Sequence, residues 1–178
     1  MDHVMIDLET LGVTPQAPIL AIGAVRFDPD TGTLGDGFEE IISFESACAH
    51  RKPEASTIAW WLQQSDDARQ GVIRGRASLE AALRRLEFYL AGFHPVVWSN
   101  GATFDIAMLE DAFRQFGYTP PWKFWNVRDV RTIVDLAYPD VPKHDFPFEG
   151  VRHSALADAE HQATYVSAMW QYLKGDKQ

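Results

Sequence analysis

The sequence predicts an α/β protein with a mixed β-sheet, in which an antiparallel three-strand meander is joined by two parallel strands and flanked by helices. Three observations lead to this prediction. Short apolar segments separated by turns open the chain, helical spacing of apolar residues follows, and two later strand-like segments each run into a helical pattern. The length of 178 residues suits one domain, and 46% hydrophobic residues suffice for a packed core. We therefore expect residues 1–178 to form a single domain.

The first three strands are expected at residues 4–9, 19–27 and 38–44. Turn-forming residues fill the intervals at 12–18 and 28–32, where glycine and proline favour loops. Connections this short join strands that run antiparallel, because a parallel pair needs a longer crossover. The N-terminal part of the chain is therefore predicted to be a meander.

Helices are expected next, at residues 54–64 and 78–93, where apolar residues recur at helical spacing and Ser78 is a natural N-cap. A strand at 95–99 leads into a helix from about 103 to 116, which Gly117 ends. A further strand at 124–127 leads into a helix at about 129–137. After a proline-containing loop at 138–150, a last helix is expected from about 154 to 173.

Composition narrows the classes of function. A total of 16 basic and 25 acidic residues gives a net charge of −9, which argues against a surface that binds polyanions generally. Nucleic acid is not excluded, because bound metal ions can supply positive charge locally. Cys48 is the single cysteine, which excludes an intramolecular disulfide framework and favours a reducing compartment, so we expect a cytoplasmic protein. With no secretory signal and no apolar run of about 18 residues, no membrane contact is expected.

Asp7 and Glu9 are the first candidate site residues. They lie two positions apart on an expected strand, so both side chains point to one face of the sheet. The apolar neighbours Ile6 and Leu8 indicate a central, partly buried strand, where unpaired acids are costly. A hard divalent cation such as Mg²⁺ or Mn²⁺, which prefers oxygen ligands, would relieve that cost. A solvated strand end with two ordinary acids is the alternative.

Two later segments of the chain contribute further candidate site residues, two acids and a histidine. Asp105 lies just past a strand end, where ligands bind in open α/β sheets, although a helix dipole would also stabilise an acid there without any function. His153 and Asp158 lie five positions apart at the start of the last helix, where they could place a base and a metal ligand at one site. Taken alone, His153 is an ordinary helix-start histidine. Small residues would let this helix lie close to the sheet: Ala155, Ala157, Ala159 and Ala163.

Three sequence motifs, taken together and in this order, resemble those of a known protein family. Residues 6–10 read Ile-Asp-Leu-Glu-Thr, residues 100–105 read Asn-Gly-Ala-Thr-Phe-Asp, and residues 153–159 read His-Ser-Ala-Leu-Ala-Asp-Ala. In this order they resemble the three exonuclease motifs of the DnaQ-like superfamily, and the histidine five positions before the last aspartate is similar to its DEDDh branch. Residues 57–64 and 121–132 resemble, more narrowly, a phage and bacterial subfamily of small 3′–5′ exonucleases that includes mycobacterial exoribonuclease-like proteins and phage exonuclease A.

The resemblance implies an RNase H-like fold and two bound divalent ions, Mg²⁺ or Mn²⁺. The implied reaction is hydrolysis of phosphodiester bonds from the 3′ end of single-stranded RNA or DNA, with release of nucleoside 5′-monophosphates. Asp7 would bridge both ions, and Glu9 and Asp158 would complete one site. Asp105 would hold the second ion through water, and His153 would take a proton from the attacking water.

Candidate substrate contacts lie beside these motifs. By the resemblance, Thr10 and Leu11 contact the terminal nucleotide. We assign the same role to Trp61, Asn100 and Phe104.

Two tryptophan-containing segments are less specific candidates for contact with nucleic acid. Trp60 and Trp61 point about 100° apart on a helix, so either one packs inside while the other stacks on a base, or both are half-buried. Further along the chain, aromatic and basic residues alternate, either as a nucleic-acid surface or as core and dimer contacts. These residues are Trp122, Lys123, Phe124, Trp125, Arg128 and Arg131.

Two other functions stay open at this point. An RNase H-type endonuclease uses a similar carboxylate set on a similar sheet, although the histidine–aspartate pair favours the exonuclease. A proofreading or adaptor subunit that acts mainly by binding a partner is the second alternative. RNA and DNA are not distinguished, because one or two local contacts decide whether a 2′-hydroxyl is read. A homodimer is expected from the resemblance and from the tryptophan-rich segments.

Overall fold

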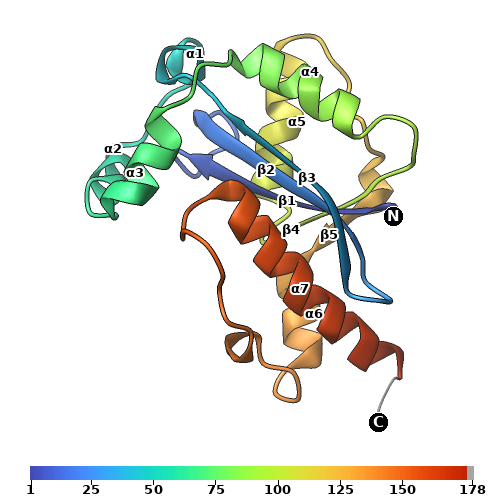
Figure 1. Ribbon diagram of the computed structural model, residues 1–178. Coiled ribbons are helices and arrows are strands. Elements are labelled where there is room, and N and C mark those ends of the chain that lie inside the picture. The colour runs from blue at the N-terminus through green and yellow to red at the C-terminus, as the bar shows by residue number, and fades with distance from the viewer. Residues whose placement is uncertain (176–178) are drawn as a thin grey trace.

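The five strands of a mixed sheet form the centre of the molecule. The structure is a computed structural model that describes residues 1–175. The sheet has the order β3-β2-β1-β4-β5 (Figure 1). β1, β2 and β3 pair antiparallel, whereas β4 runs parallel to β1 and β5 parallel to β4. The predicted meander with two added parallel strands is therefore confirmed. The strands are β1 (His3–Thr10), β2 (Ile19–Asp28), β3 (Thr33–Ile41), β4 (Val96–Ser99) and β5 (Val127–Asp129).

Helices cover both faces of the sheet. One face carries α4 and α5, and the other carries the long α7 with α6 packed against it (Figure 1). The short α1, α2 and α3 lie at the end of the sheet where β1 finishes. The helices are α1 (Phe44–Cys48), α2 (Ala55–Trp61), α3 (Asp66–Ile73), α4 (Leu79–Tyr89), α5 (Asp105–Gln115), α6 (Val130–Ala137) and α7 (Ala155–Lys174), with 3-10 turns η1 (Phe124–Asn126) and η2 (Lys143–Asp145).

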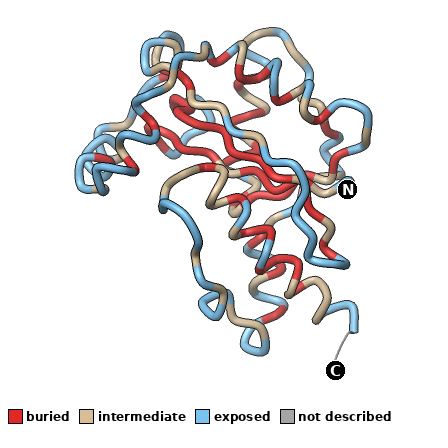
Figure 2. Tube along the Cα trace, viewed as in Figure 1, coloured by how far each residue is buried: buried red, intermediate tan, exposed pale blue. Residues whose placement is uncertain are grey.

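Alternation along β1 divides the core into two layers. Ile6 and Leu8 belong to the cluster under α4 and α5, whereas Met5 belongs to the cluster under α6 and α7. Figure 2 shows the central strands buried between these layers. β1 is thus the central, buried strand that its apolar residues predicted, and any polar side chain on it must find a partner inside the molecule.

Small residues allow α7 to lie close on the sheet, as the sequence predicted. Ala155, Ala159 and Ala163 are all buried. On the facing strand, a Cβ at Gly23 would overlap the backbone of Ala155 and Leu156. Because neither side carries bulk at this crossing, the first turns of α7 are pressed against β2 beside β1.

Several boundaries differ from the prediction. The strand expected at 38–44 begins earlier, at Thr33, and Phe44 starts α1 instead; β3 is an exposed edge strand, so it lacks a strong apolar alternation. The helices α1 and α3 were not predicted; serine N-caps begin both, since the hydroxyls of Ser43 and Ser65 accept from backbone N–H groups. The strand expected at 124–127 is a 3-10 turn, and the β5 pairing starts only at Val127.

No helix within residues 1–175 combines the length and the apolar character that crossing a membrane requires.

Candidate active site

An acidic cluster forms where β1 passes beneath the first turns of α7. Asp7 and Glu9 project from the face of β1 that α7 covers, and Nε2 of Gln162 in α7 donates a hydrogen bond to Oδ1 of Asp7 at 2.8 Å. Asp158 lies one turn earlier on the same helix face. Ligand atoms of Glu9, His153 and Asp158 all lie within 4.8 Å of one another. The strand period and the helix period thus direct three acids into one site.

Asp105 joins the cluster from the end of β4. The turn after this strand contains Gly101 with φ of +119°, a conformation that L side chains rarely adopt. Asp129 fixes the turn, because its Oδ2 accepts the backbone N–H of Ala102 at 2.7 Å. α5 therefore starts at Asp105, whose Oδ1 accepts the backbone N–H of Leu8 in β1 at 3.2 Å.

His153 occupies a strained position at the entrance of α7. Within residues 1–175, it is the single non-glycine residue with positive φ, at 64°. The left-handed conformation costs about 1–2 kcal/mol for a residue with a Cβ, and such strain gathers at functional sites. The backbone N–H of His153 donates to Oδ2 of Asp158 at 2.9 Å, and its ring meets that of Trp60 edge-on at 4.9 Å between centroids. Both contacts hold the imidazole beside the acids.

Burial raises the pKa of every acid in the cluster, and neighbouring carboxylates add to the rise at Asp7 and Glu9. Burial, followed by the charges of Asp158 and Asp105, raises the pKa of Glu9 to about 8. Burial raises the pKa of Asp105 to about 7, against the lowering effect of the Leu8 hydrogen bond. The pKa of Asp7 is raised well above its usual value by burial and then by the three other carboxylates, and burial also raises the pKa of Asp158. Without a cation, the cluster binds protons at neutral pH.

The same residues fit a hard divalent cation. The cluster offers carboxylate oxygens, which Mg²⁺ and Mn²⁺ prefer, and it places them where an uncompensated charge is unfavourable. In the part of the chain that the structure describes, Oε1 of Gln162 is buried beside Asp7 without a hydrogen-bond partner. A hydrated cation next to Asp7 would supply the missing donor.

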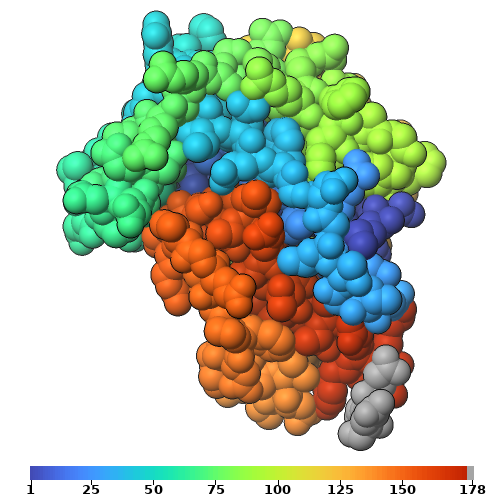
Figure 3. Space-filling model, viewed as in Figure 1, coloured from blue at the N-terminus to red at the C-terminus, as the bar shows by residue number. Residues whose placement is uncertain are grey.

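Two hollows open on the Glu9 side of the cluster. One, of about 360 Å³, has Thr10, Trp60, Trp61 and Phe104 among its lining residues. The other, of about 180 Å³, is bounded by α3, β3 and the residues from His153 to Ala155. Figure 3 shows the molecular surface hollowed between α3 and the start of α7. Glu9 therefore lies at the base of an accessible cleft with one aromatic wall, and the other acids lie behind it.

Comparison with known proteins identifies this arrangement. Residues 2–170 match the 3′–5′ exoribonuclease Rv2179c-like domain. The chain belongs to this family. It is accordingly a 3′–5′ exonuclease, and its family implies divalent metal ions at the acidic cluster.

Individual relatives agree with this assignment. Over 159 residues, this chain is 26% identical to the exodeoxyribonuclease of Enterobacteria phage T4. The match covers 74% of this chain and 70% of the phage protein. The nuclease domain of 3′hExo, a DEDDh family member bound to rAMP, superposes with a TM-score of 0.62 at 15% identity, covering 96% of this chain and 92% of that domain. The E. coli ExoI–ssDNA complex gives a TM-score of 0.67 at 16% identity, covering 98% of this chain but only 40% of ExoI. These likenesses show the RNase H-like fold of DEDDh nucleases.

The residues that the sequence analysis assigned to substrate binding do not all line one hollow. Thr10 and Phe104 line the 360 Å³ hollow. Leu11 does not line it, because its side chain is buried in the core. Asn100 lines a different pocket, beside Asp158 and Gln162.

Trp61 lines the 360 Å³ hollow, so its assignment to the substrate stays a prediction. Trp61 is 6% exposed, and its Nε1 donates to the backbone oxygen of Thr10 at 2.8 Å, so it also holds the end of β1 in place. Trp60 lines the same hollow and is 41% exposed, so more of its ring is available to a base. Sequence alone could not distinguish them, because the helix face that turns inward depends on how α2 docks.

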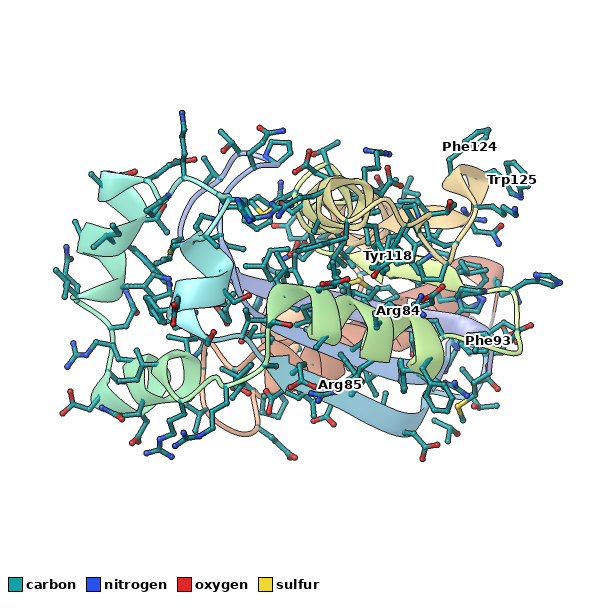
Figure 4. The ribbon with its side chains drawn as sticks, turned by 90° about the horizontal axis from the view of Figure 1, so that it is seen from above. Arg84, Arg85, Phe93, Tyr118, Phe124 and Trp125 are labelled. Atoms are coloured by element: carbon teal, nitrogen blue, oxygen red, sulfur yellow. The ribbon has the colours of Figure 1, made fainter. Side chains whose placement is uncertain are left out.

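The aromatic and basic residues around 122–131 do not form one surface. Trp122 is buried against Phe113, and Arg131 lies beside Gly101. Phe124 and Trp125 are exposed on η1 and point away from the body of the molecule (Figure 4).

Gln162 was missed by the sequence analysis. Its position in the sequence could have revealed it, because Gln162 follows Asp158 by four positions and therefore lies on the same face of α7.

Proposed function

We propose that the chain removes nucleoside 5′-monophosphates one at a time from the 3′ end of single-stranded RNA or DNA. The observation that carries this proposal is the acidic cluster at the base of a cleft with an exposed tryptophan. Relatives offer support: 3′hExo is bound to rAMP, and ExoI is bound to single-stranded DNA. An open cleft with a stacking ring suits a flexible terminal nucleotide better than a rigid duplex.

In this proposal, four carboxylates hold two divalent ions, Mg²⁺ or Mn²⁺. Asp7, Glu9 and Asp158 would hold one ion, and Asp7 together with Asp105 would hold the second. When bound, such a pair of ions stabilises the attacking and leaving oxygens of a phosphodiester. Gln162 holds the Asp7 carboxylate in position through the hydrogen bond at 2.8 Å.

His153 acts in the proposed reaction as the general base. It accepts a proton from the attacking water, whose oxygen forms a bond to phosphorus while the bond from phosphorus to the 3′-oxygen of the preceding nucleotide breaks. That oxygen takes up a proton from solvent. The products are a nucleoside 5′-monophosphate and a chain shorter by one nucleotide. Thr10, Trp60 and Phe104 surround the terminal nucleoside, with Trp60 stacking on its base.

We further infer that residues 1–178 act as one exonuclease domain, and we keep the cytoplasm as the expected location on the basis of the single Cys48. The expected homodimer stays a prediction that the mass of the protein in solution will test.

Digestion of matched 5′-labelled RNA and DNA oligonucleotides with Mg²⁺ or Mn²⁺ tests the proposal. We expect a ladder that shortens by single nucleotides, 5′-monophosphate products, and no cleavage of a circular oligonucleotide, which has no 3′ end. Cleavage of the circle would instead support an RNase H-type endonuclease. Partner capture without any nuclease activity would support an adaptor subunit. The ratio of the RNA and DNA rates gives the sugar preference.

A further inference from the structure

The 360 Å³ hollow beside Trp60 is the proposed nucleoside hollow. A second pocket, of about 400 Å³, opens on the opposite side of the acidic cluster from it. Asp158 and Gln162 form its edge toward the cluster, whereas Glu9 and Thr10, which line the nucleoside hollow, are absent from it. Its remaining walls come from Asn100 after β4, from the loop before α7 and from His161 and Tyr165 of the helix. The acids thus lie between an aromatic hollow and this second pocket.

Basic side chains line this second pocket. Lys143, Arg152 and His161 converge there, and Arg152 lies over the ring of Phe148 at 5.1 Å. The ring of His161 is packed between Phe148 and Tyr165, at 5.1 Å and 5.3 Å between centroids. Burial, opposed by the charge of Asp158, lowers the pKa of His161, and the charges of Arg152 and Lys143 lower it further. The cations are therefore close enough to influence one another.

In the described part of the chain, the two longest of these cations have no carboxylate within salt-bridge distance, although the charge of Arg152 acts on Asp158 at longer range. Among residues 1–175, neither Lys143 nor Arg152 forms a salt bridge, whereas Arg84 is paired with Glu87 and Arg85 with Glu40. In a chain with a net charge of −9, unpaired cations gathered beside four acids are a local exception. Their charge would attract an anion to the side of the cluster that faces away from the nucleoside hollow.

We propose that Lys143 and Arg152 bind the backbone phosphate immediately 5′ to the scissile phosphodiester, with His161 as the floor of this subsite. This inference rests on the proposed function. With the terminal nucleoside on the Glu9 side and the scissile bond at the acids, the preceding nucleotide leaves the cluster past Asp158 and Gln162. A phosphate diester is the anion that every such nucleotide carries, whatever its base or sugar, so the subsite accepts RNA and DNA alike.

The test compares two substrates that differ in the upstream phosphate. The p-nitrophenyl ester of thymidine 5′-monophosphate has a scissile phosphodiester and a terminal nucleoside but no upstream phosphate, whereas a ten-nucleotide strand has all three. For the double variant Lys143→Ala/Arg152→Ala, we expect the ratio of kcat/KM on the strand to kcat/KM on the ester to fall by about tenfold. We also expect the slope of log(kcat/KM) for the strand against log[salt] to become shallower by about 0.7, because the contact with one backbone phosphate is lost.

The double variant Arg84→Ala/Arg85→Ala is the matched control. It removes the same charge from α4, on the opposite side of the sheet from α7 (Figure 4). Both the ratio and the salt slope should stay as in the unsubstituted protein. An unchanged ratio in Lys143→Ala/Arg152→Ala would overturn the inference, and so would equal losses on both substrates, since the cations would then act on the acidic cluster itself.

A binding measurement separates failure of the subsite from failure of the proposed function. On a His153→Ala background with Ca²⁺, fluorescence anisotropy of a labelled ten-nucleotide strand should give a Kd about tenfold higher when Lys143 and Arg152 are replaced. An unchanged Kd would overturn the subsite even if the protein degraded no substrate. Absence of all hydrolysis together with the expected Kd change would instead overturn the proposed reaction and support the phosphate subsite.

Discussion

The backbone N–H of His153 donates a hydrogen bond to Oδ2 of Asp158 at 2.9 Å, which ties a strained loop residue to an acid one helical turn into α7. The bond contributes an N–H to the carboxylate and fixes the direction in which the imidazole leaves the chain. Because it uses the backbone rather than the ring, the imidazole nitrogens stay available for a proton. The position of the proposed base is therefore coupled to a proposed metal ligand.

Replacing the His153 side chain should separate catalysis from metal binding. In His153→Ala, the backbone bond to Asp158 persists, so the rise in Tm on adding Mg²⁺ should survive. The rate should fall on the order of 10²–10⁴-fold, which is the usual loss for a missing general base. Turnover and metal-dependent melting of one preparation provide the measurement, with His94→Ala, in the exposed loop before β4, as the control. Near-normal turnover would remove His153 from the mechanism.

The stability of the metal-free protein should fall as pH rises. The pKa values of Glu9, at about 8, and Asp105, at about 7, lie above their usual values, so the folded state binds more protons than the unfolded state. The free energy of unfolding should consequently decrease from about pH 4 to about pH 8. Mg²⁺ replaces these protons, so it should raise Tm more at pH 8.5 than at pH 5.5. Thermal melts in EDTA and in Mg²⁺ test this.

Removing one carboxylate should weaken that pH dependence. In Asp7→Asn, the buried carboxyl that Asp105, Glu9 and Asp158 repel is lost, so the melting temperature in EDTA should stay equal or rise, while nuclease activity disappears. Asp135→Asn, on the exposed surface of α6, is the control and should change neither property. A variant that keeps more than about a tenth of the activity would contradict the two-metal proposal.

The two neighbouring tryptophans should give opposite results. Trp60→Ala removes an exposed stacking ring and should raise KM by about tenfold with little change in stability. Trp61→Ala removes a buried side chain and its hydrogen bond to Thr10, and should lower the free energy of unfolding by about 3–5 kcal/mol. Urea melts and steady-state kinetics on both variants test the pair. If Trp61→Ala changed only KM, the substrate contact would belong to Trp61 after all.

Gly23 should be intolerant of even one added methyl group. In Gly23→Ala, the new Cβ would overlap the backbone at Ala155 and Leu156, which cannot yield as a flexible side chain could. We expect a loss on the order of 1–3 kcal/mol in the free energy of unfolding, together with lower activity, because α7 carries Asp158 and Gln162. Gly71→Ala, where the new Cβ would meet no atom within 4 Å, is the matched control.

Local sequence patterns predicted much of the fold. The meander, the N-cap of α4 and the helix after each parallel strand follow from apolar spacing and turn residues, because these act over a few neighbouring positions. The short helices α1 and α3 escaped prediction, since five and eight residues hold too little periodicity to register. The edge strand β3 escaped in part, because it faces solvent and needs no apolar alternation.

The sequence by itself determined that Asp7 and Glu9 share one face, because side chains alternate along any strand. It determined equally that Asp158 and Gln162 share one face of a helix. Only the tertiary structure decided that these two faces meet, that Trp60 rather than Trp61 stays exposed, and that Lys143 and Arg152 line a pocket beyond Asp158. The reason is physical: backbone stereochemistry fixes directions within an element, whereas the docking of α7 over Gly23 depends on packing between residues distant in the chain.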